Sequence, residues 1–229
     1  NGPTDLVIFR VSDGALLNLM PFSGDPVFTP AGNLVRPGPS IEIRSVSDGT
    51  ILDLVAASTD NQAPTFSPDG QVLASVDGND VVLWRVAEGV VSTRFSGLGK
   101  NVQALAFSPH GRILASGGKD GVVRIWNIDQ TSQPVVQKQG QPITAVVFTP
   151  DGERLLTGDS NGRINVRATN TGVSADIWYG QSSIAALALS PDGTWLVSGG
   201  KGPPLRLWDV RTGQAIASAA HGAGVVALA

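Results

Sequence analysis

The sequence predicts an all-β fold assembled from repeated four-stranded antiparallel sheets. A turn of the form Phe-Ser-Pro-Asp-Gly recurs at Phe28, Phe66, Phe107, Phe148 and Leu189, with starts 38, 41, 41 and 41 residues apart. A second series of strands, each ending near an aromatic residue or its substitute, is marked by Phe9, Arg44, Trp84, Trp126, Arg167 and Trp208. Because the two series advance along the chain by similar intervals, one structural unit is repeated.

Each unit is expected to begin with an inner strand and a tight turn. The stretches VQALAF and ITAVVF are almost continuously apolar, which is typical of a strand buried on both faces. In the Ser-Pro-Asp-Gly that follows, proline presets φ, aspartate can bond its own backbone and glycine accepts a positive φ. This turn therefore predicts a hairpin to a second strand.

A second turn and two further strands are expected to complete the unit. After RILASGG, turns such as GKDG and DSNG place Asp or Asn beside Gly, and a third strand such as VVRIW follows. The fourth segment, for example QAIASAA or PVVQKQG, is less apolar, as expected of an outer strand whose free edge meets water. One unit thus predicts one small antiparallel sheet.

A single sheet of this size cannot bury both of its faces, so several such sheets are expected to pack against one another. Arranged radially they pack face to face around an axis, which predicts a β-propeller. The repeats resemble the WD-repeat family, whose units of about 40 to 45 residues often close a strand with Trp-Asp. Trp208-Asp209 has this form, and Trp84-Arg85 and Trp126-Asn127 are relaxed versions. The regular turns and the frequent Gly and Ala resemble bacterial members of the family.

The register predicts a single domain, residues 1–229, with five full blades and a partial blade at each end. Residues 1–21 supply third and fourth strands, and residues 222–229 supply an inner strand. Inner strands of the full blades are expected to start near Ser23, Asn61, Val102, Ile143 and Ile184, in blades at about 22–58, 59–98, 99–140, 141–180 and 181–221. Two interpretations stay open: a segment of a seven-bladed propeller, which we favour, or a six-bladed ring that lacks one strand.

Composition argues against several classes of partner and site. The net charge of −3 and the absence of any Lys or Arg run weigh against nucleic acid. The chain has no cysteine, which excludes disulfides, thiolate metal sites and cysteine nucleophiles. No stretch approaches the roughly 20 apolar residues that span a bilayer, so a membrane is not an expected partner. The compartment stays open, with the cytoplasm favoured.

The family resemblance implies a structural hydrogen-bond network in a regular repeat. Its members are a His before the inner strand, Ser or Thr on the second strand, Asp in the next turn and Trp on the third strand. The matching residues are Ser75, Asp80, Trp84, Ser116, Asp120, Trp126, Thr157, Ser198, Trp208 and His221. Arg167 replaces Trp in the fourth full unit, and the second and third units lack the His. A catalytic Ser-His-Asp triad is therefore disfavoured.

Other chemically suggestive residues have simpler structural interpretations. His110 lies in a turn where other units have Asp or Ala, and the acidic turns DGND and DSNG favour Asp and Asn for backbone reasons rather than for calcium. The stretch GLGK lacks the spacing and following helix of a phosphate-binding loop. Trp178, Tyr179 and Trp195 lie on expected strands, where packing is the commoner use. We expect no catalytic residue, no metal site and no cofactor.

The resemblance also implies a partner-binding surface at the mouth of the propeller funnel. In the family, the residue before each inner strand and the next outward-facing residue commonly contact partners. We call the corresponding positions the mouth residues: Asp60, Asn101, Gln103, Pro142, Thr144, Ser183 and Gly224. They are mostly small and polar and include no Arg or aromatic hot spot, which favours a weak or peptide-sized contact, or the use of another face.

The expected function is therefore a non-catalytic scaffold or regulatory sensor that binds a protein or peptide, within a larger chain whose other domains are further partners. Two alternatives stay open. A propeller enzyme of hydrolase or lactonase type would bring two or more titratable groups together at the funnel. A carbohydrate-binding propeller would need Trp178 or Tyr179 exposed.

Overall fold

The computed structural model describes residues 4–9, 16–22, 27–29, 33–36, 40–45, 50–57, 62–96, 102–129, 134–179, 183–200 and 205–219. Within these ranges every regular element is a β-strand, which confirms the predicted all-β class. The chain divides into two compact units, Asn1–Gly97 and Leu98–Ala229. The single domain inferred from the repeat register stays a prediction.

The first unit contains antiparallel sheets of two and four strands in its described residues. The hairpin of β1 (Thr4–Phe9) and β2 (Leu16–Phe22) falls where the sequence places a third and a fourth strand. One four-stranded sheet follows in the order β3 (Val27–Phe28), β4 (Leu34–Arg36), β5 (Ser40–Arg44) and β6 (Ile51–Ala57). The next is formed by β7 (Gln62–Phe66), β8 (Val72–Asp77), β9 (Asp80–Arg85) and β10 (Val90–Phe95).

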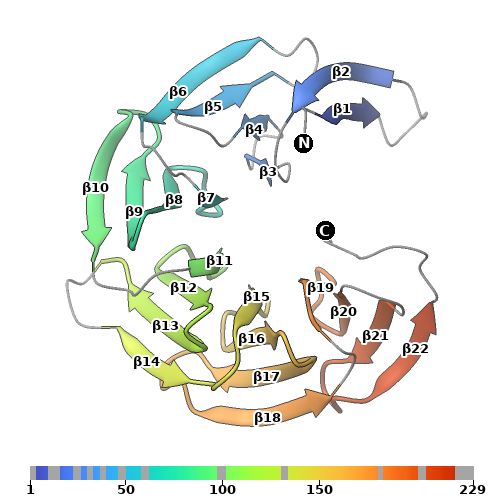
Figure 1. Ribbon diagram of the computed structural model, residues 1–229. Coiled ribbons are helices and arrows are strands. Elements are labelled where there is room, and N and C mark those ends of the chain that lie inside the picture. The colour runs from blue at the N-terminus through green and yellow to red at the C-terminus, as the bar shows by residue number, and fades with distance from the viewer. Residues whose placement is uncertain are drawn as a thin grey trace. The chain divides into compact units, whose positions relative to one another are not determined.

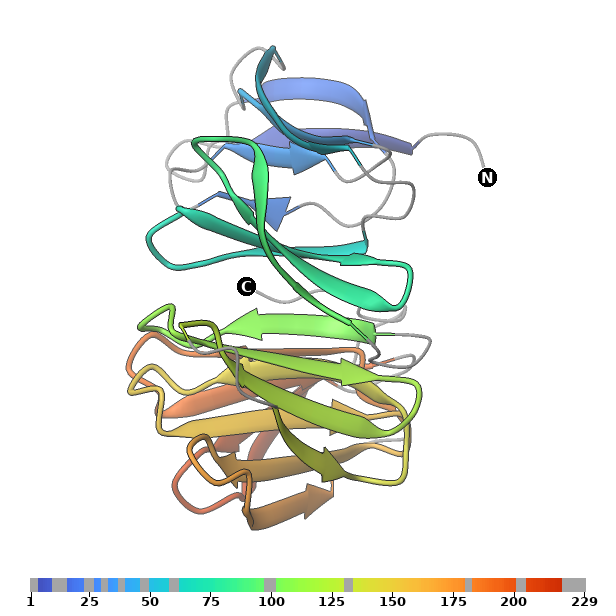
Figure 2. The ribbon, with the colours of Figure 1, turned by 90° about the vertical axis from the view of Figure 1, so that its left-hand side faces the viewer.

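The second unit contains three consecutive four-stranded sheets in its described part (Figures 1 and 2). The first consists of β11 (Val102–Phe107), β12 (Ile113–Gly118), β13 (Val122–Asn127) and β14 (Val135–Lys138). The second consists of β15 (Ile143–Phe148), β16 (Arg154–Asp159), β17 (Arg163–Ala168) and β18 (Ser174–Tyr179). The third consists of β19 (Ala186–Leu189), β20 (Trp195–Gly199), β21 (Leu205–Asp209) and β22 (Ala215–Ala219).

The inner strands begin close to their predicted positions. β11 and β15 start at Val102 and Ile143, as predicted, and β7 starts one residue after Asn61. β19 starts two residues after the predicted Ile184, because the Ile184 N–H donates to Asp159 O of the preceding sheet at 3.0 Å. β3 starts at Val27, and the predicted start at Ser23 lies outside the described residues.

The recurrent Pro-containing turns form the predicted hairpins between first and second strands. Their glycines have positive φ angles of 72°, 71°, 72° and 71° at Gly70, Gly111, Gly152 and Gly193. Each of these glycine N–H groups donates at 2.8 Å to the carbonyl of the Ser or Thr three residues earlier. A side chain in this left-handed conformation would be strained, so the repeated glycine has a direct conformational cause.

The core of the second unit lies between consecutive sheets rather than within one. Ala115, Val123 and Ile125 of the first sheet form a buried cluster with Ile143 and Leu155 of the second. A similar cluster joins the second sheet to the third. Within this unit, the facing sides of consecutive sheets are therefore buried against each other, as the repeat pattern predicts. This stacking fixes where each inner strand begins, and with it the positions of the mouth residues.

Candidate interaction face

The structure describes four of the seven mouth residues. Gln103 is exposed on β11, and Pro142, Thr144 and Ser183 are partly exposed at or before their inner strands. Asp60, Asn101 and Gly224 lie outside the described residues. Gln103 is therefore the most accessible mouth residue among those described.

Local irregularities of the inner strands set the direction of two mouth residues. The pairing of β11 with β12 shifts register between Val102 and Ala104, and the pairing of β15 with β16 shifts between Ile143 and Ala145. Gln103 and Thr144 occupy these bulges. A β-bulge locally re-aims side chains and is common beside functional sites. The bulges explain why both residues depart from the buried pattern of their strands.

Thr144 has a structural hydrogen bond that its sequence position did not reveal. Its hydroxyl lies 2.5 Å from the carbonyl oxygen of Ile184 in the following sheet and 3.2 Å from Gly158 O. A hydroxyl has one proton, so the shorter contact takes the donor. Thr144 thus links consecutive sheets, and only its remaining surface can meet a partner.

Ion pairs flank the bulges at the same end of the sheets. Register pairs Val102 with Gly118 and Ile143 with Asp159, so the turns between second and third strands lie beside the starts of the inner strands. In these turns Asp120 accepts from Arg124 at 2.9 Å, and buried Asp159 accepts from Arg163 at 3.0 Å. Arginine therefore neutralises both of these carboxylates locally.

Two of the Ser–Trp pairs predicted for the structural network are hydrogen-bonded. The indole N–H of Trp84 donates to Ser75 Oγ at 3.0 Å, and that of Trp208 donates to Ser198 Oγ at 2.9 Å. All four residues are buried. Each bond ties the second strand of its sheet to the third, which supports a structural role for these residues.

The remaining predicted network members are placed differently. Ser116 and Trp126 are both buried, but Ser116 Oγ has no hydrogen-bond partner among the described residues. Asp80 of β9 pairs with Arg94 of the neighbouring strand β10, and Asp120 pairs with Arg124 of β13, the strand that its turn leads into. His221 lies outside the described residues. In these two repeats the aspartate of the network therefore forms an ion pair with an arginine.

In the repeat formed by β15 to β18, a cluster of polar side chains stands where the family pattern has His and Trp. Thr157 Oγ1 donates to Gln139 Oε1 at 2.9 Å, and Arg167 Nη2 donates to the same oxygen at 3.3 Å. Gln139 lies three residues before Pro142, just as His221 lies three residues before Gly224. Gln139 therefore takes the His position, and this shared offset is the sequence signal that could have identified it.

Arg167 is a buried cation without a carboxylate partner in the described part of the chain. Its side chain is 5% exposed, and it also donates to Gly172 O at 3.3 Å, while its Nε has no hydrogen-bond partner among the described residues. Burial lowers the pKa of the guanidinium. Since burying a charge is costly, the neutral oxygen of Gln139 is an important acceptor for it.

Replacing Gln139 should therefore destabilise the fold. Gln139→Leu removes the acceptor shared by Thr157 and Arg167, and we expect a loss of about 1–3 kcal/mol in the free energy of unfolding. Urea denaturation followed by circular dichroism measures this loss. Gln71→Leu, at an exposed turn position, is the control and should change little. Equal midpoints for the two variants would contradict the assigned role.

Aspartates in the repeated turns accept strong local hydrogen bonds. Asp69, Asp151 and Asp192 each lie 2.5 Å from the hydroxyl of the Ser or Thr two residues earlier. Each also accepts a backbone N–H two residues later, at 2.9 to 3.0 Å. The hydroxyl bond, reinforced by the backbone bond, lowers the pKa of all three carboxyls, that of Asp192 to about 2.

These lowered pKa values predict an acid-sensitive contribution to stability. An unfolded Asp has a pKa of about 3.9, so the folded carboxylates stabilise the protein above about pH 4 and lose this effect as the pH falls through their folded pKa values. A triple variant with Asp69→Asn, Asp151→Asn and Asp192→Asn should be less stable than the parent at pH 7. Urea denaturation from pH 7 to pH 2 should show the difference shrinking in acid. A difference that does not depend on pH would contradict the assignment.

The aromatic candidates for sugar stacking differ in accessibility. Trp178 is 5% exposed and stacks on Trp208, with ring centroids 6.0 Å apart and an angle of 21° between the planes. Trp178 therefore packs between two sheets and offers no platform to a sugar. Tyr179 is 69% exposed on β18 and Trp195 is 39% exposed on β20. His110 is exposed in its turn, as expected.

A metal-binding cluster and a membrane-spanning helix are both absent from the residues that the structure describes. Among the residues that the structure describes, no three His, Asp or Glu side chains gather in a group that could hold a metal ion. No helix in the described residues is long and apolar enough to cross a membrane.

Comparison with known proteins identifies the repeat. The family model of the WD domain, G-beta repeat, matches residues 89–127, 132–166 and 172–209. The comparison with curated proteins found no match. The three matches are consecutive, and they end at or near the end of the third strands β13, β17 and β21. Taken with the four-stranded antiparallel sheets and the Trp–Ser hydrogen bonds, they establish that the chain belongs to the WD-repeat family.

Proposed function

We propose that this chain is a non-catalytic interaction module that binds a protein or peptide through its mouth residues. The observation that carries the proposal is the run of three WD repeats, because such repeats generally mediate protein–protein interaction. The family is also typically non-enzymatic. In this role the chain is a scaffold or sensor whose activity is binding rather than catalysis.

The geometry of the mouth residues supports a small, mostly neutral contact. Gln103 presents an amide, which can both donate and accept hydrogen bonds, from an exposed bulge. The nearby Asp120 and Asp159 are already paired with arginines. A peptide backbone or a polar loop suits such a surface better than a strongly charged ligand does. Without large aromatic anchors, we expect modest affinity.

A second candidate surface lies on the outer strand β18. Val173, Ile177 and Tyr179 are 61%, 41% and 69% exposed in and just before this strand. Exposed apolar side chains beside a free sheet edge can receive a partner strand. This surface would serve the same kind of function through another face, and the experiment must distinguish the two.

Affinity capture from source lysate tests the proposal with three matched variants. Gln103→Arg with Ser183→Arg alters the mouth residues, Ile177→Arg alters β18, and Val136→Arg alters an exposed position on β14 as the control. Thr144 is left intact because its hydroxyl joins two sheets. Circular dichroism and urea denaturation confirm that each variant is folded.

We expect one protein to be retained by the parent, the β18 variant and the control, and to be lost with the double variant. If the captured protein were lost only with Ile177→Arg, the binding surface would be the outer strand β18 and not the mouth residues. Retention by all variants, or no retained protein at all, would contradict binding through the mouth residues.

A further inference from the structure

The turn between β11 and β12 lacks a carboxylate that the other described Pro-containing turns have. In those turns Asp69, Asp151 and Asp192 each accept a hydrogen bond from the Ser or Thr hydroxyl two residues earlier. Each also accepts one from the backbone N–H two residues later. His110 stands at this position between β11 and β12. Two hydrogen-bond donors of this turn therefore lose their usual acceptor.

The rest of this turn keeps the geometry of the others. Gly111 has a φ of 71°, and its N–H donates to Ser108 O at 2.8 Å. Ser108 is 3% exposed, and its Oγ accepts from the Ile113 N–H at 3.2 Å. Neither the Ser108 hydroxyl proton nor the Arg112 backbone N–H has an acceptor among the described residues. Both donors are thus held in place for one carboxylate oxygen.

The side chain of His110 extends to the following sheet instead of folding back onto its own turn. Its Nδ1 lies 3.3 Å from a Cβ built on Gly152, in the turn between β15 and β16. In the next pair of turns, a Cβ built on Gly193 meets Pro150 but does not come within 4 Å of Asp151. The imidazole therefore leaves the place of the missing aspartate open.

Two adjoining cavities open at this turn, and we call them together the turn groove. The first, of about 520 Å³, is lined by Ser108, His110, Arg112, Ile113 and Gly152. The second, of about 560 Å³, shares Ile113 and Gly152 with the first and extends to Glu153, Arg154 and Thr169. The turn groove follows the end of β11, whereas Gln103 lies near the start of that strand. It is therefore separate from the mouth residues.

A second departure from the repeat pattern lies in the same groove. The Thr169 N–H donates to Glu153 O at 2.9 Å, and the corresponding bonds in three other repeats are made by Val86, Ile128 and Val210. Those three side chains are apolar, whereas Thr169 has a hydroxyl. Thr169 is 4% exposed, and its Oγ1 has no hydrogen-bond partner among the described residues. Because an unpaired buried hydroxyl is costly, it favours a polar ligand here.

The charges that line the turn groove favour an anion. Arg112 and Arg154 stand against the carboxylate of Glu153. Arg112 pairs with Asp129 at 3.8 Å, and both of these side chains are exposed. Exposed ion pairs contribute little free energy, so the Arg112 guanidinium can turn to a ligand.

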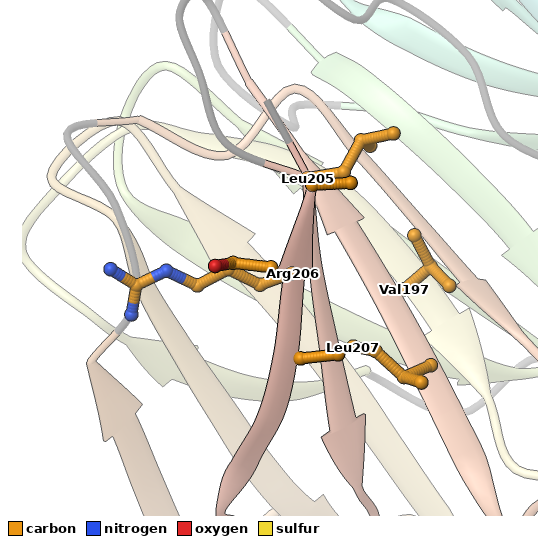
Figure 3. A pocket seen from close by; sticks show the side chains of 7 residues that line it. Val197, Leu205, Arg206 and Leu207 are labelled. Carbon is orange, nitrogen blue, oxygen red and sulfur yellow. The ribbon is translucent and has the colours of Figure 1, made fainter. Parts of the chain in front are cut away.

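The hollow on the last described sheet lacks these features. Figure 3 shows Val197, Leu205 and Leu207 pointing to one side of that sheet, with Arg206 pointing to the other. The lining of this hollow is almost entirely apolar. The turn groove is therefore the better candidate for a charged ligand.

We propose that the turn groove binds the carboxylate of an Asp or Glu side chain from a peptide or protein partner. One carboxylate oxygen accepts from the Ser108 hydroxyl and the Arg112 N–H, as aspartate does in the other turns, and the Arg112 guanidinium neutralises the charge. The adjoining cavity accommodates the backbone that carries this carboxylate, and the Thr169 hydroxyl bonds to it. This inference does not rest on the proposed binding through the mouth residues.

Amide NMR of the isotope-labelled full chain tests the site with four probes: acetyl-Gly-Asp-Gly-amide, its Asn counterpart, sodium acetate and inorganic phosphate. His110→Asp supplies the missing carboxylate within the turn and should block the site. His110→Ala removes the imidazole without supplying an acceptor and is the matched control. Thr169→Val introduces the side chain that two other repeats have, at Val86 and Val210, and removes the hydroxyl contact.

We expect the Asp peptide, but not the Asn peptide, to shift the Arg112 N–H signal saturably. His110→Asp should weaken binding of the Asp peptide by at least about tenfold, because it takes two charge-assisted hydrogen bonds from the ligand. His110→Ala should leave binding nearly unchanged. Thr169→Val should weaken binding of the peptide but not of acetate, since only the peptide reaches this hydroxyl.

Several outcomes would overturn the proposal. These are no shift with the Asp peptide, equal shifts with the two peptides, and equal binding by His110→Asp and His110→Ala. Acetate that binds as tightly as the Asp peptide, or equal peptide binding with and without the Thr169 hydroxyl, would assign the site to a small free acid. Phosphate that binds more tightly than the Asp peptide would assign it to a phosphate group. Either assignment rules out the peptide carboxylate.

A second measurement needs no ligand. At pH 7, His110→Asp should give a higher urea midpoint than His110→Ala, because the introduced carboxylate accepts from the Ser108 hydroxyl and the Arg112 N–H. Equal midpoints would show that these two donors are already satisfied in the folded chain, which would also overturn the proposal.

Discussion

Trp208→Ala is expected to lower the free energy of unfolding by about 3–5 kcal/mol. Trp208 is buried, stacks on Trp178 of the neighbouring sheet and donates its indole N–H to Ser198. The substitution therefore leaves a large cavity between two sheets and removes a buried hydrogen bond. Urea denaturation followed by circular dichroism or tryptophan fluorescence measures the loss.

Trp195→Ala is the matched control for this prediction. Trp195 lies on the neighbouring strand of the same sheet but is 39% exposed. Its loss should cost clearly less than that of Trp208, since fewer of its atoms leave water on folding. Similar losses for the two variants would mean that the contact between Trp178 and Trp208 does not hold the sheets together.

Ile184→Ala is expected to cost about 2–5 kcal/mol, because its fully buried side chain fills the space above Gly158. Gly158→Ala is expected to cost about 1–3 kcal/mol, because the added methyl group collides with the same isoleucine. The two substitutions act on one contact and should not be additive.

A double-mutant cycle in urea measures this coupling. In the Gly158→Ala background, Ile184→Ala should cost less than it does alone, because the smaller side chain relieves the collision. Additive losses would show that Gly158 and Ile184 are not in direct contact between the two sheets.

Strands and turns could be predicted because their causes are local. The alternation of buried positions and the Pro-Asp-Gly turns both depend on residues that are close together in the sequence. Accordingly, β11 and β15 begin at the predicted Val102 and Ile143. The later start of β19 was missed because it depends on a hydrogen bond from Ile184 to the preceding sheet. Local signals determine which elements form, whereas contacts between sheets adjust their ends.

The candidate site was less predictable because its residues act across sheets. The sequence identified Thr144 as a mouth residue, but nothing local signals that its hydroxyl bonds to a carbonyl 40 residues away. Gln139 was missed because the family pattern has His at this position and not Gln. Its side chain nevertheless accepts hydrogen bonds from Thr157, which matches the pattern, and from Arg167, which replaces Trp. Substituted networks of this kind become visible only when side-chain geometry is known.

Site-specific photocross-linking at Gln103 tests the central claim, that this WD-repeat chain binds a partner through its mouth residues. A photoreactive phenylalanine analogue is placed at Gln103, at Tyr179 on β18 or at Val136 on β14, and each folded variant is irradiated in source lysate. We predict one discrete cross-linked protein from position 103 and none from the other two. A discrete product from position 179, or none from position 103, would contradict the account.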